Sequence, residues 1–187
     1  MTLQGLNPRE VWNERMADRL LEIFDYQEVK KVIRKHYKVL TPYFADCKSL
    51  LDVGCGFQPR LYNIPETFGI DVSRDMLTRG RQFHAHFPFI HGSAYKLPFK
   101  NKIFDGSQSL GVMRHMEHWQ PVIAEMKRVT KRKLAFSLLI CDEKHQCGKY
   151  QWCNSMDEVT SHFSNKMETV FLRDLGSFKN MLFLVEV

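Results

Sequence analysis

The feature that most constrains this sequence is a short apolar run that leads directly into a glycine turn, over residues 49–56. The run, SLLDV, has the nearly continuous apolar character of a strand that is buried on both faces of a parallel sheet. Gly54 and Gly56 follow it, and glycines there allow a tight turn whose backbone N–H groups can approach a ligand closely. Asp52 would lie near the carboxyl end of the strand, the edge at which open α/β sheets bind ligands. The stretch therefore predicts an α/β fold with a ligand site at this turn.

A second apolar segment ends in an acidic residue further along the chain. Residues 67–70 (TFGI) are followed by Asp71, about twenty residues after Asp52. An acidic side chain in that place can accept hydrogen bonds from both ribose hydroxyls of a nucleoside cofactor. Position 59 is Pro, so the turn lacks the full Gly-x-Gly-x-x-Gly loop that is typical of nicotinamide dinucleotide sites.

These residues resemble the cofactor loop of class I S-adenosylmethionine-dependent methyltransferases (type 11-like), whose pattern is hydrophobic-hydrophobic-Asp-hydrophobic-Gly-Cys-Gly. Residues 92–99 (GSAYKLPF) are similar to the family's Gly-Asp-Ala-x-x-Leu-Pro-Phe, and Phe104-Asp105 is similar to the start of its fourth strand. The resemblance runs from about Lys48 to Val187. It implies an α/β, Rossmann-like, seven-stranded and mostly parallel sheet with helices on both faces and an antiparallel C-terminal hairpin.

We expect a single domain over residues 1–187, because this length suits one α/β domain with a full core. Residues 1–45 are predicted to form an N-terminal helical lid segment, and residues 46–187 the cofactor-binding core. In the family such a segment helps to shape the acceptor site, which implies substrate contacts for Trp12 and Arg15. The alternative for Trp12 is that it packs in the core, as large aromatic side chains usually do.

The resemblance implies S-adenosylmethionine as cofactor and S-adenosylhomocysteine as product. The residues implied at the methionine end of the cofactor are Asp52, Gly54, Gly56, Ser109 and Leu110. Those implied at its ribose and adenine are Asp71, Val72, Met76, Ser93 and Ala94.

Two positions depart from the family pattern. Gln58 replaces a small residue in the loop, and Ser93 replaces the Asp that receives the adenine amino group, although a hydroxyl can still accept a hydrogen bond. Arg60 is a candidate to neutralise the cofactor carboxylate. Pro59 and Pro65 predict that the first crossover helix is short.

His115 and His118 are the candidates for a general base, because they follow the fourth predicted strand at the mouth of the pocket. His115 is also a candidate substrate contact. A base is needed only where the acceptor must lose a proton, since alignment of the two reactants supplies much of the acceleration. The alternative is that both histidines are hydrogen-bonding or surface residues.

The cysteines predict neither a disulfide framework nor a metal site. Cys141, His145, Cys147 and Cys153 could bind zinc, but their spacing lacks a Cys-x-x-Cys knuckle and Cys141 is expected to end a strand. We therefore interpret them as separate thiols, and this cysteine usage favours a reducing, cytoplasmic setting. The absence of any apolar run near 18 residues predicts no membrane contact.

The predicted function is methyl transfer to a small-molecule acceptor, because nearly the whole chain is needed for the sheet. RNA is an alternative acceptor, suggested by the net charge of +6 and the basic stretches at residues 30–38 and 127–133. A third possibility is a non-catalytic cofactor-binding or scaffold protein, suggested by Gln58, Ser93 and the missing Pro-Gly-Gly turn. The oligomeric state is left open.

Overall fold

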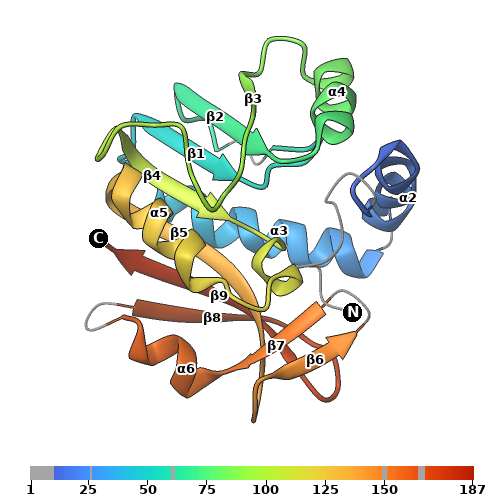
Figure 1. The fold of residues 1–187 in the computed structure, drawn as a ribbon, viewed down its shortest axis with the longest axis vertical. Coiled ribbons are helices and arrows are strands. Elements are labelled where there is room, and N and C mark those ends of the chain that lie inside the picture. The colour runs from blue at the N-terminus through green and yellow to red at the C-terminus, as the bar shows by residue number, and fades with distance from the viewer. Residues whose placement is uncertain (1–10, 26, 60–61, 149–150, 164–166) are drawn as a thin grey trace.

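The computed structural model describes residues 11–25, 27–59, 62–148, 151–163 and 167–187. A nine-stranded, mostly parallel sheet crosses the molecule, and helices cover both of its faces (Figure 1). The strands are β1 (Ser49–Val53), β2 (Glu66–Asp71), β3 (Phe89–His91), β4 (Phe104–Ser109), β5 (Thr130–Cys141), β6 (His145–Gly148), β7 (Gln151–Ser155), β8 (Met167–Asp174) and β9 (Lys179–Glu186). The helices are α2 (Glu14–Asp25), α3 (Gln27–Tyr43), α4 (Arg74–Phe83), the 3-10 turn η2 (Met113–His115), α5 (Gln120–Val129) and α6 (Met156–Ser161).

The first predicted strand, β1, is central to the sheet and is buried at every residue. Leu51 and Val53 pack on the face covered by α5, and Leu50 packs on the opposite face against α3. β1 pairs in parallel with β2 on one side and with β4 on the other. The apolar run in the sequence therefore reflects a strand that is covered on both sides, as parallel strands usually are.

The strand order is β3-β2-β1-β4-β5, and two pairs of strands extend the sheet beyond β5. On one edge β5 pairs with β9, and β9 pairs with β8 in the predicted antiparallel C-terminal hairpin. On its other edge β5 pairs first with β4 and then, at residues 139–141, with β7. The seven predicted strands are confirmed, and the β6–β7 hairpin adds two that were not predicted, because these short segments lack regular apolar alternation.

The strand β5 begins at Thr130, four residues before the predicted start at Leu134. Its charged first residues are tied to the neighbouring segments, since Lys131 pairs with Asp105 and Lys133 with Asp46. Partial burial acts to raise the pKa of Asp105, but hydrogen bonds from Lys131 and from the Lys48 and Ser49 N–H groups lower it to about 2. These ion pairs allow the strand to extend beyond the apolar core.

The helices differ from the sequence prediction at two places. The described part of the segment between β1 and β2, residues 54–59 and 62–65, contains no helix and consists of turns and bends. Pro59 and Pro65 limit this segment more strongly than predicted, because each removes a backbone donor. In contrast, α3 continues through Pro42 to Tyr43, where it packs under the sheet.

The two N-terminal helices have different positions. Buried residues of α3, including Leu40, pack against the sheet, so this helix is a layer of the core. Helix α2 instead docks on α4, where Asp18 pairs with Arg79 and the Trp12 carbonyl accepts a hydrogen bond from the Ser73 hydroxyl. The helix start predicted at Asn7-Pro8 lies outside the described residues. Within the described part of the chain, no helix combines the length and apolar character that a bilayer span requires.

Candidate functional site

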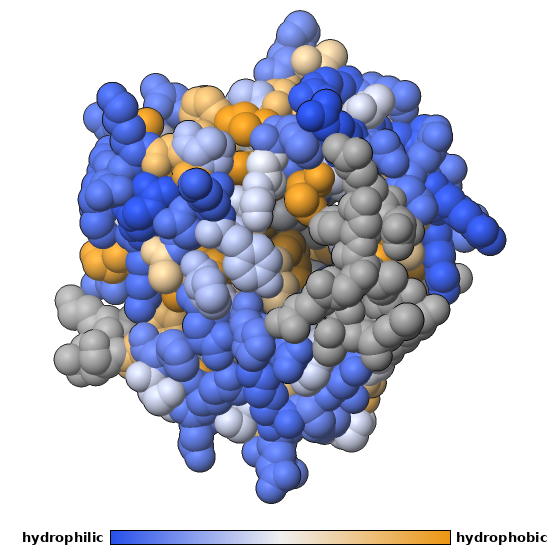
Figure 2. Space-filling view, in the orientation of Figure 1, coloured by the Kyte–Doolittle hydropathy of each residue, from blue (hydrophilic) through white to orange (hydrophobic). Residues whose placement is uncertain are grey.

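A cavity of about 830 Å³ opens at the carboxyl ends of β1, β2 and β4 and is bordered by α2, α3 and the segment around η2. Figure 2 shows apolar surface inside a hollow near the centre of the face that it draws, among largely hydrophilic surroundings. The sequence-predicted site residues that line the cavity are Trp12, Asp52, Gly54, Gly56, Asp71, Val72, Met76, Ser93, Ala94, Leu110, His115 and His118. These residues come from segments far apart in sequence, and the sheet brings them to one edge.

The glycine turn after β1 has a backbone conformation that requires glycine at two positions. Gly54 has φ +75° and Gly56 has φ +55°, both in the left-handed region. A Cβ at Gly54 would lie 2.4 Å from a methyl group of Val112, whereas a Cβ at Gly56 would meet nothing within 4 Å. The Gly54 N–H donates to the carbonyl of Ile70 at 2.7 Å, which fixes the turn against β2. The space outside Gly56 is therefore open to a ligand.

Asp71 ends β2 and faces this turn. Its carboxylate accepts hydrogen bonds from the N–H groups of Gly56 and Ser73, each at 2.9 Å. Burial raises the pKa of Asp71, and the two N–H donors oppose that shift. A carboxylate has about four acceptor positions, so two remain for hydroxyl groups of a ligand. This arrangement fits the ribose of a nucleoside cofactor.

The residues next to Asp71 offer an apolar surface on one side and polar groups on the other. Val72 is 37% exposed, which is high for an apolar residue at a strand end. Met76 lines the cavity but is largely buried, where it packs with Phe57 and Ala17. The Ser93 hydroxyl accepts the Tyr95 N–H at 3.2 Å and retains its own proton for donation. Val72 and Ser93 are therefore placed to border a planar base.

Ser109 and Arg15, in contrast, are outside the cavity lining. The fully buried Ser109 hydroxyl donates to the Val53 carbonyl at 2.9 Å and so ties β4 to the end of β1. Arg15 is on the exposed side of α2. Arg60 lies outside the described residues. Ser109 thus supports the glycine turn from behind, and Leu110, which follows it, is the residue that reaches the cavity.

Trp12 and His115 meet in the lining of the cavity. Their rings make an edge-to-face contact with centroids 4.9 Å apart, which connects the N-terminal segment to η2. His118 is more exposed, and its Nε2 lies 3.9 Å from a carboxylate oxygen of Glu117. The buried Trp119 fixes this segment, because its indole N–H donates to the Asn154 side chain at 3.0 Å.

Several lining residues were not among the predicted site residues. Arg114 and Glu117 border the end of the cavity near His115, and Ser137 lies below it on β5. The Ser137 hydroxyl accepts the Gly111 N–H at 2.8 Å, which holds the turn after β4. The sequence offered one signal for Arg114 and Glu117, since each directly precedes a predicted histidine. Nothing in the sequence distinguishes Ser137 from other strand residues.

The profile of the protein family described as "Methyltransferase domain" matches residues 51–136. The chain is 33% identical over 75 residues to demethylmenaquinone methyltransferase of Streptomyces avermitilis, and 28% identical over 116 residues to an uncharacterized protein of Methanocaldococcus jannaschii. These matches cover 40% and 61% of this chain but 32% and 45% of the two relatives. The chain thus spans less than half the length of these curated relatives.

Solved structures show the same fold over nearly the whole chain. Magnesium protoporphyrin IX methyltransferase from Synechocystis PCC 6803, crystallised with bound S-adenosylmethionine, has a TM-score of 0.71 to this structure. The superposition covers 95% of this chain and 94% of that chain at 16% sequence identity. Residues 51–136 therefore match a methyltransferase domain, and the chain has the fold of the class I S-adenosylmethionine-dependent methyltransferases.

Proposed function

We propose that this protein catalyses S-adenosylmethionine-dependent methyl transfer to a small molecule. The observation that carries the proposal is the pairing of Asp71 with the glycine turn at the mouth of an open cavity. Asp71 would hold the ribose hydroxyls, and Val72 and Ser93 would border the adenine. Asp52, Gly54 and Gly56 would line the methionine end. When bound, the cofactor supplies a methyl group activated by its sulfonium.

The protein's own contribution is then alignment and the exclusion of water. Methyl transfer is an in-line displacement, so the acceptor must be held opposite the departing sulfur. Trp12 and His115, whose rings meet in the cavity lining, would orient it, and α2 borders the site where water must be excluded. His115 or His118 would accept a proton where the acceptor carries one, as a hydroxyl or carbon acid does.

The pairing of charges in the second basic stretch supports a small acceptor over RNA. The basic stretch at residues 127–133 lies at the junction of α5 and β5, away from the carboxyl edge of the sheet. At this junction its cations pair with Asp46, Asp105 and Glu125. Charges that are already paired contribute less to phosphate binding. Two of the three similar proteins reported above also have names that refer to small molecules, a demethylmenaquinone and a magnesium protoporphyrin.

Ligand-dependent melting tests the cofactor part of the proposal. At a concentration 100 times its dissociation constant, S-adenosylhomocysteine should stabilise the fold by about 2.7 kcal/mol, which raises Tm by roughly 5–10 °C for a domain of this size. Differential scanning fluorimetry with adenosine as a matched control measures this shift. An unchanged Tm at millimolar S-adenosylhomocysteine would contradict the proposal and favour the scaffold alternative.

We further propose that the acceptor carries an anionic group. Arg114 lines the cavity beside His115, and no carboxylate of the described residues lies within 4 Å of its guanidinium. Burial lowers the pKa of Arg114, but a guanidinium remains charged at neutral pH. A partly buried cation of this kind is best stabilised by a carboxylate or phosphate on the ligand.

Substitution of Arg114 tests this acceptor class. With labelled S-adenosylmethionine and pairs of candidate acceptors that differ only in a free carboxylate or its amide, the wild type should prefer the acid. Arg114→Gln should lower kcat/KM for the acid by about 10–100-fold and leave the amide nearly unchanged, because one charge-assisted hydrogen bond is lost. Arg19→Gln, on the exposed side of α2, is the matched control. An acid preference that survives in Arg114→Gln would contradict this assignment.

A further inference from the structure

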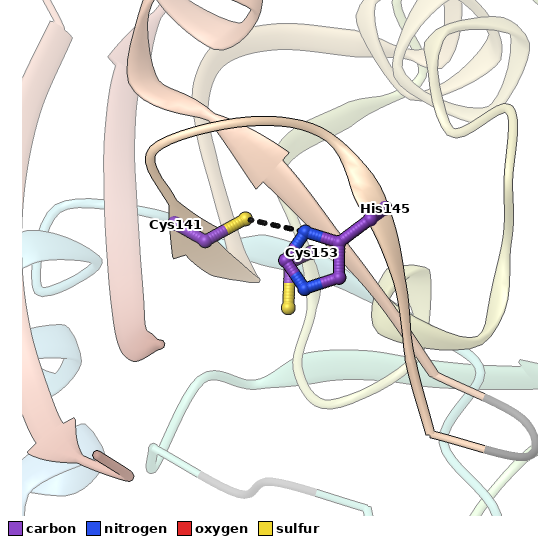
Figure 3. Close-up of side chains that lie close together, drawn as sticks. All are labelled: Cys141, His145 and Cys153. Atoms are coloured by element: carbon purple, nitrogen blue, oxygen red, sulfur yellow. Dashed lines mark hydrogen bonds between the residues drawn. The ribbon is translucent and has the colours of Figure 1, made fainter. Parts of the chain in front are cut away.

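A cluster of soft ligands lies where β5 ends and the β6–β7 hairpin begins. Cys141, His145 and Cys153 each offer one ligand atom, and these atoms all lie within 4.8 Å of one another. Figure 3 shows the Cys141 and His145 side chains converging from two sides, with Cys153 beside the imidazole ring. The three residues are between four and twelve positions apart in sequence, so the fold of the hairpin creates the cluster.

The register of the sheet explains why these side chains meet. Cys153 of β7 is paired with Leu139 of β5 on one side and with His145 of β6 on the other. Paired residues in neighbouring strands point to the same face of a sheet, as do residues two apart on one strand. Cys141, two residues after Leu139, therefore shares a face with Cys153 and His145. Regular strand geometry thus fixes all three ligands.

The His145 imidazole already has the ring orientation and backbone hydrogen bond that are common in metal-bound histidines. Its Nδ1 lies 2.7 Å from the carbonyl oxygen of Glu143 and 3.7 Å from the Sγ of Cys141. A proton on Nδ1 donated to this carbonyl leaves the lone pair of the imidazole on Nε2. Metal-bound histidines commonly donate their other ring N–H to a backbone carbonyl in this way, which fixes the tautomer and the ring orientation.

Cys147, next to this group in the β6–β7 hairpin, is the candidate for a fourth ligand. The register of the hairpin shifts between Gln146 and Gly148, so Cys147 is the extra residue of a bulge. Burial raises the pKa of Cys153, and hydrogen bonding with Cys147 adds to that shift, so these two thiols are neighbours. The strand β7, which carries Cys153, packs against η2, which carries Arg114. The cluster thus adjoins the acceptor end of the cavity.

We propose that Cys141, His145, Cys147 and Cys153 bind one zinc ion. Three thiolates and one imidazole form a common ligand set of structural, four-coordinate zinc sites. With Zn–S bonds of about 2.3 Å, a tetrahedral site requires sulfur atoms roughly 3.8 Å apart, so the ligand atoms of Cys141, His145 and Cys153, all within 4.8 Å of one another, need to contract by only about 1 Å. The Cys147 thiol lies outside this group and would move toward it when the metal binds. Each bound cysteine loses its thiol proton to solvent when the metal binds.

Zinc at this site would fix the β6–β7 hairpin to the end of β5. The hairpin lies beside η2, because β7 contacts η2 and the Trp119 indole donates a hydrogen bond to Asn154 of β7. The metal would therefore act as a structural support for the acceptor end of the cavity. It would be independent of the cofactor turn, which lies at the ends of β1 and β2.

Zinc content and cobalt spectroscopy test this proposal without any activity assay. The full chain is reduced, loaded with zinc chloride, freed of excess metal by gel filtration and measured by plasma mass spectrometry. We expect about one zinc per chain in the wild type and less than about a tenth in Cys153→Ser, because each structural ligand is needed for a closed site. The matched control is Cys47→Ser, a buried thiol outside the cluster, which should retain the wild-type content.

Two further measurements keep the test decisive if Cys153→Ser does not fold. His145→Ala changes an exposed residue and should also lose the metal. Cobalt bound to the wild type should give the intense visible and thiolate charge-transfer bands of a tetrahedral, cysteine-rich site. Wild-type protein with less than about a tenth of an equivalent of zinc would overturn the proposal, since closed sites bind tightly. Equal zinc in the Cys153→Ser, His145→Ala and Cys47→Ser variants would also overturn it.

Discussion

Replacing Asp71 with alanine should reduce the affinity for S-adenosylhomocysteine by roughly 10²–10⁴-fold. In the proposed complex the carboxylate accepts two hydrogen bonds from the ribose, and hydrogen bonds to a charged group contribute about 1.5–3 kcal/mol each. The substitution also removes the acceptor of the Gly56 and Ser73 N–H groups, so the turn itself loses a fixed point. Both losses weaken the binding of the same ligand, so this loss of affinity is one of the two largest effects that we expect.

Isothermal titration calorimetry with S-adenosylhomocysteine measures the loss in Asp71→Ala. Asp71→Asn separates charge from shape, because an amide keeps one acceptor oxygen and should give an intermediate affinity. Asp75→Ala is the matched control, since this exposed carboxylate lies in the first turn of α4 and its loss should change affinity by no more than about twofold. Near-wild-type affinity in Asp71→Ala would remove the basis for assigning the ribose to this residue.

The meeting of Asp71 with the glycine turn could be predicted from the sequence because its signals are local. A buried strand, two glycines and a downstream acid are read directly along the chain, and the structure brings Asp71 to within 2.9 Å of the Gly56 N–H. The resemblance to class I methyltransferases is confirmed by the family profile and the fold. Ser109 shows the limit of this reasoning, because the direction of its side chain, toward the Val53 carbonyl, depends on the pairing of β4 with β1.

The cysteine cluster could not be predicted from spacing alone. Cys141, His145 and Cys153 come together through the pairing of three strands, two of which, β6 and β7, have no clear periodic signal. The acceptor end has the same limitation, since Arg114 reaches the cavity from a short 3-10 turn. Sequence reasoning is thus strongest where function depends on consecutive residues and weakest where it depends on strand register.

Replacing Gly54 with alanine should lower Tm by roughly 5–20 °C, the largest effect on stability that we expect. A residue with a Cβ costs about 1–2 kcal/mol in the left-handed conformation that Gly54 adopts, and overpacking adds about 1–3 kcal/mol. The added Cβ would lie 2.4 Å from one Val112 methyl and 2.9 Å from the other. Gly56→Ala is the matched variant, because it shares the positive φ but meets nothing within 4 Å.

A double-mutant cycle with Val112 separates the two costs of Gly54→Ala. Val112→Ala removes both methyl groups that the new Cβ would meet, so the double variant should recover about 1–3 kcal/mol relative to the sum of the single changes. The conformational cost should remain, and Gly56→Ala should show that cost alone. Thermal unfolding of the four proteins of the cycle and of Gly56→Ala measures both terms. If the effects of Gly54→Ala and Val112→Ala are additive, contact with Val112 is not the reason for glycine at position 54, and the backbone conformation alone must account for the loss.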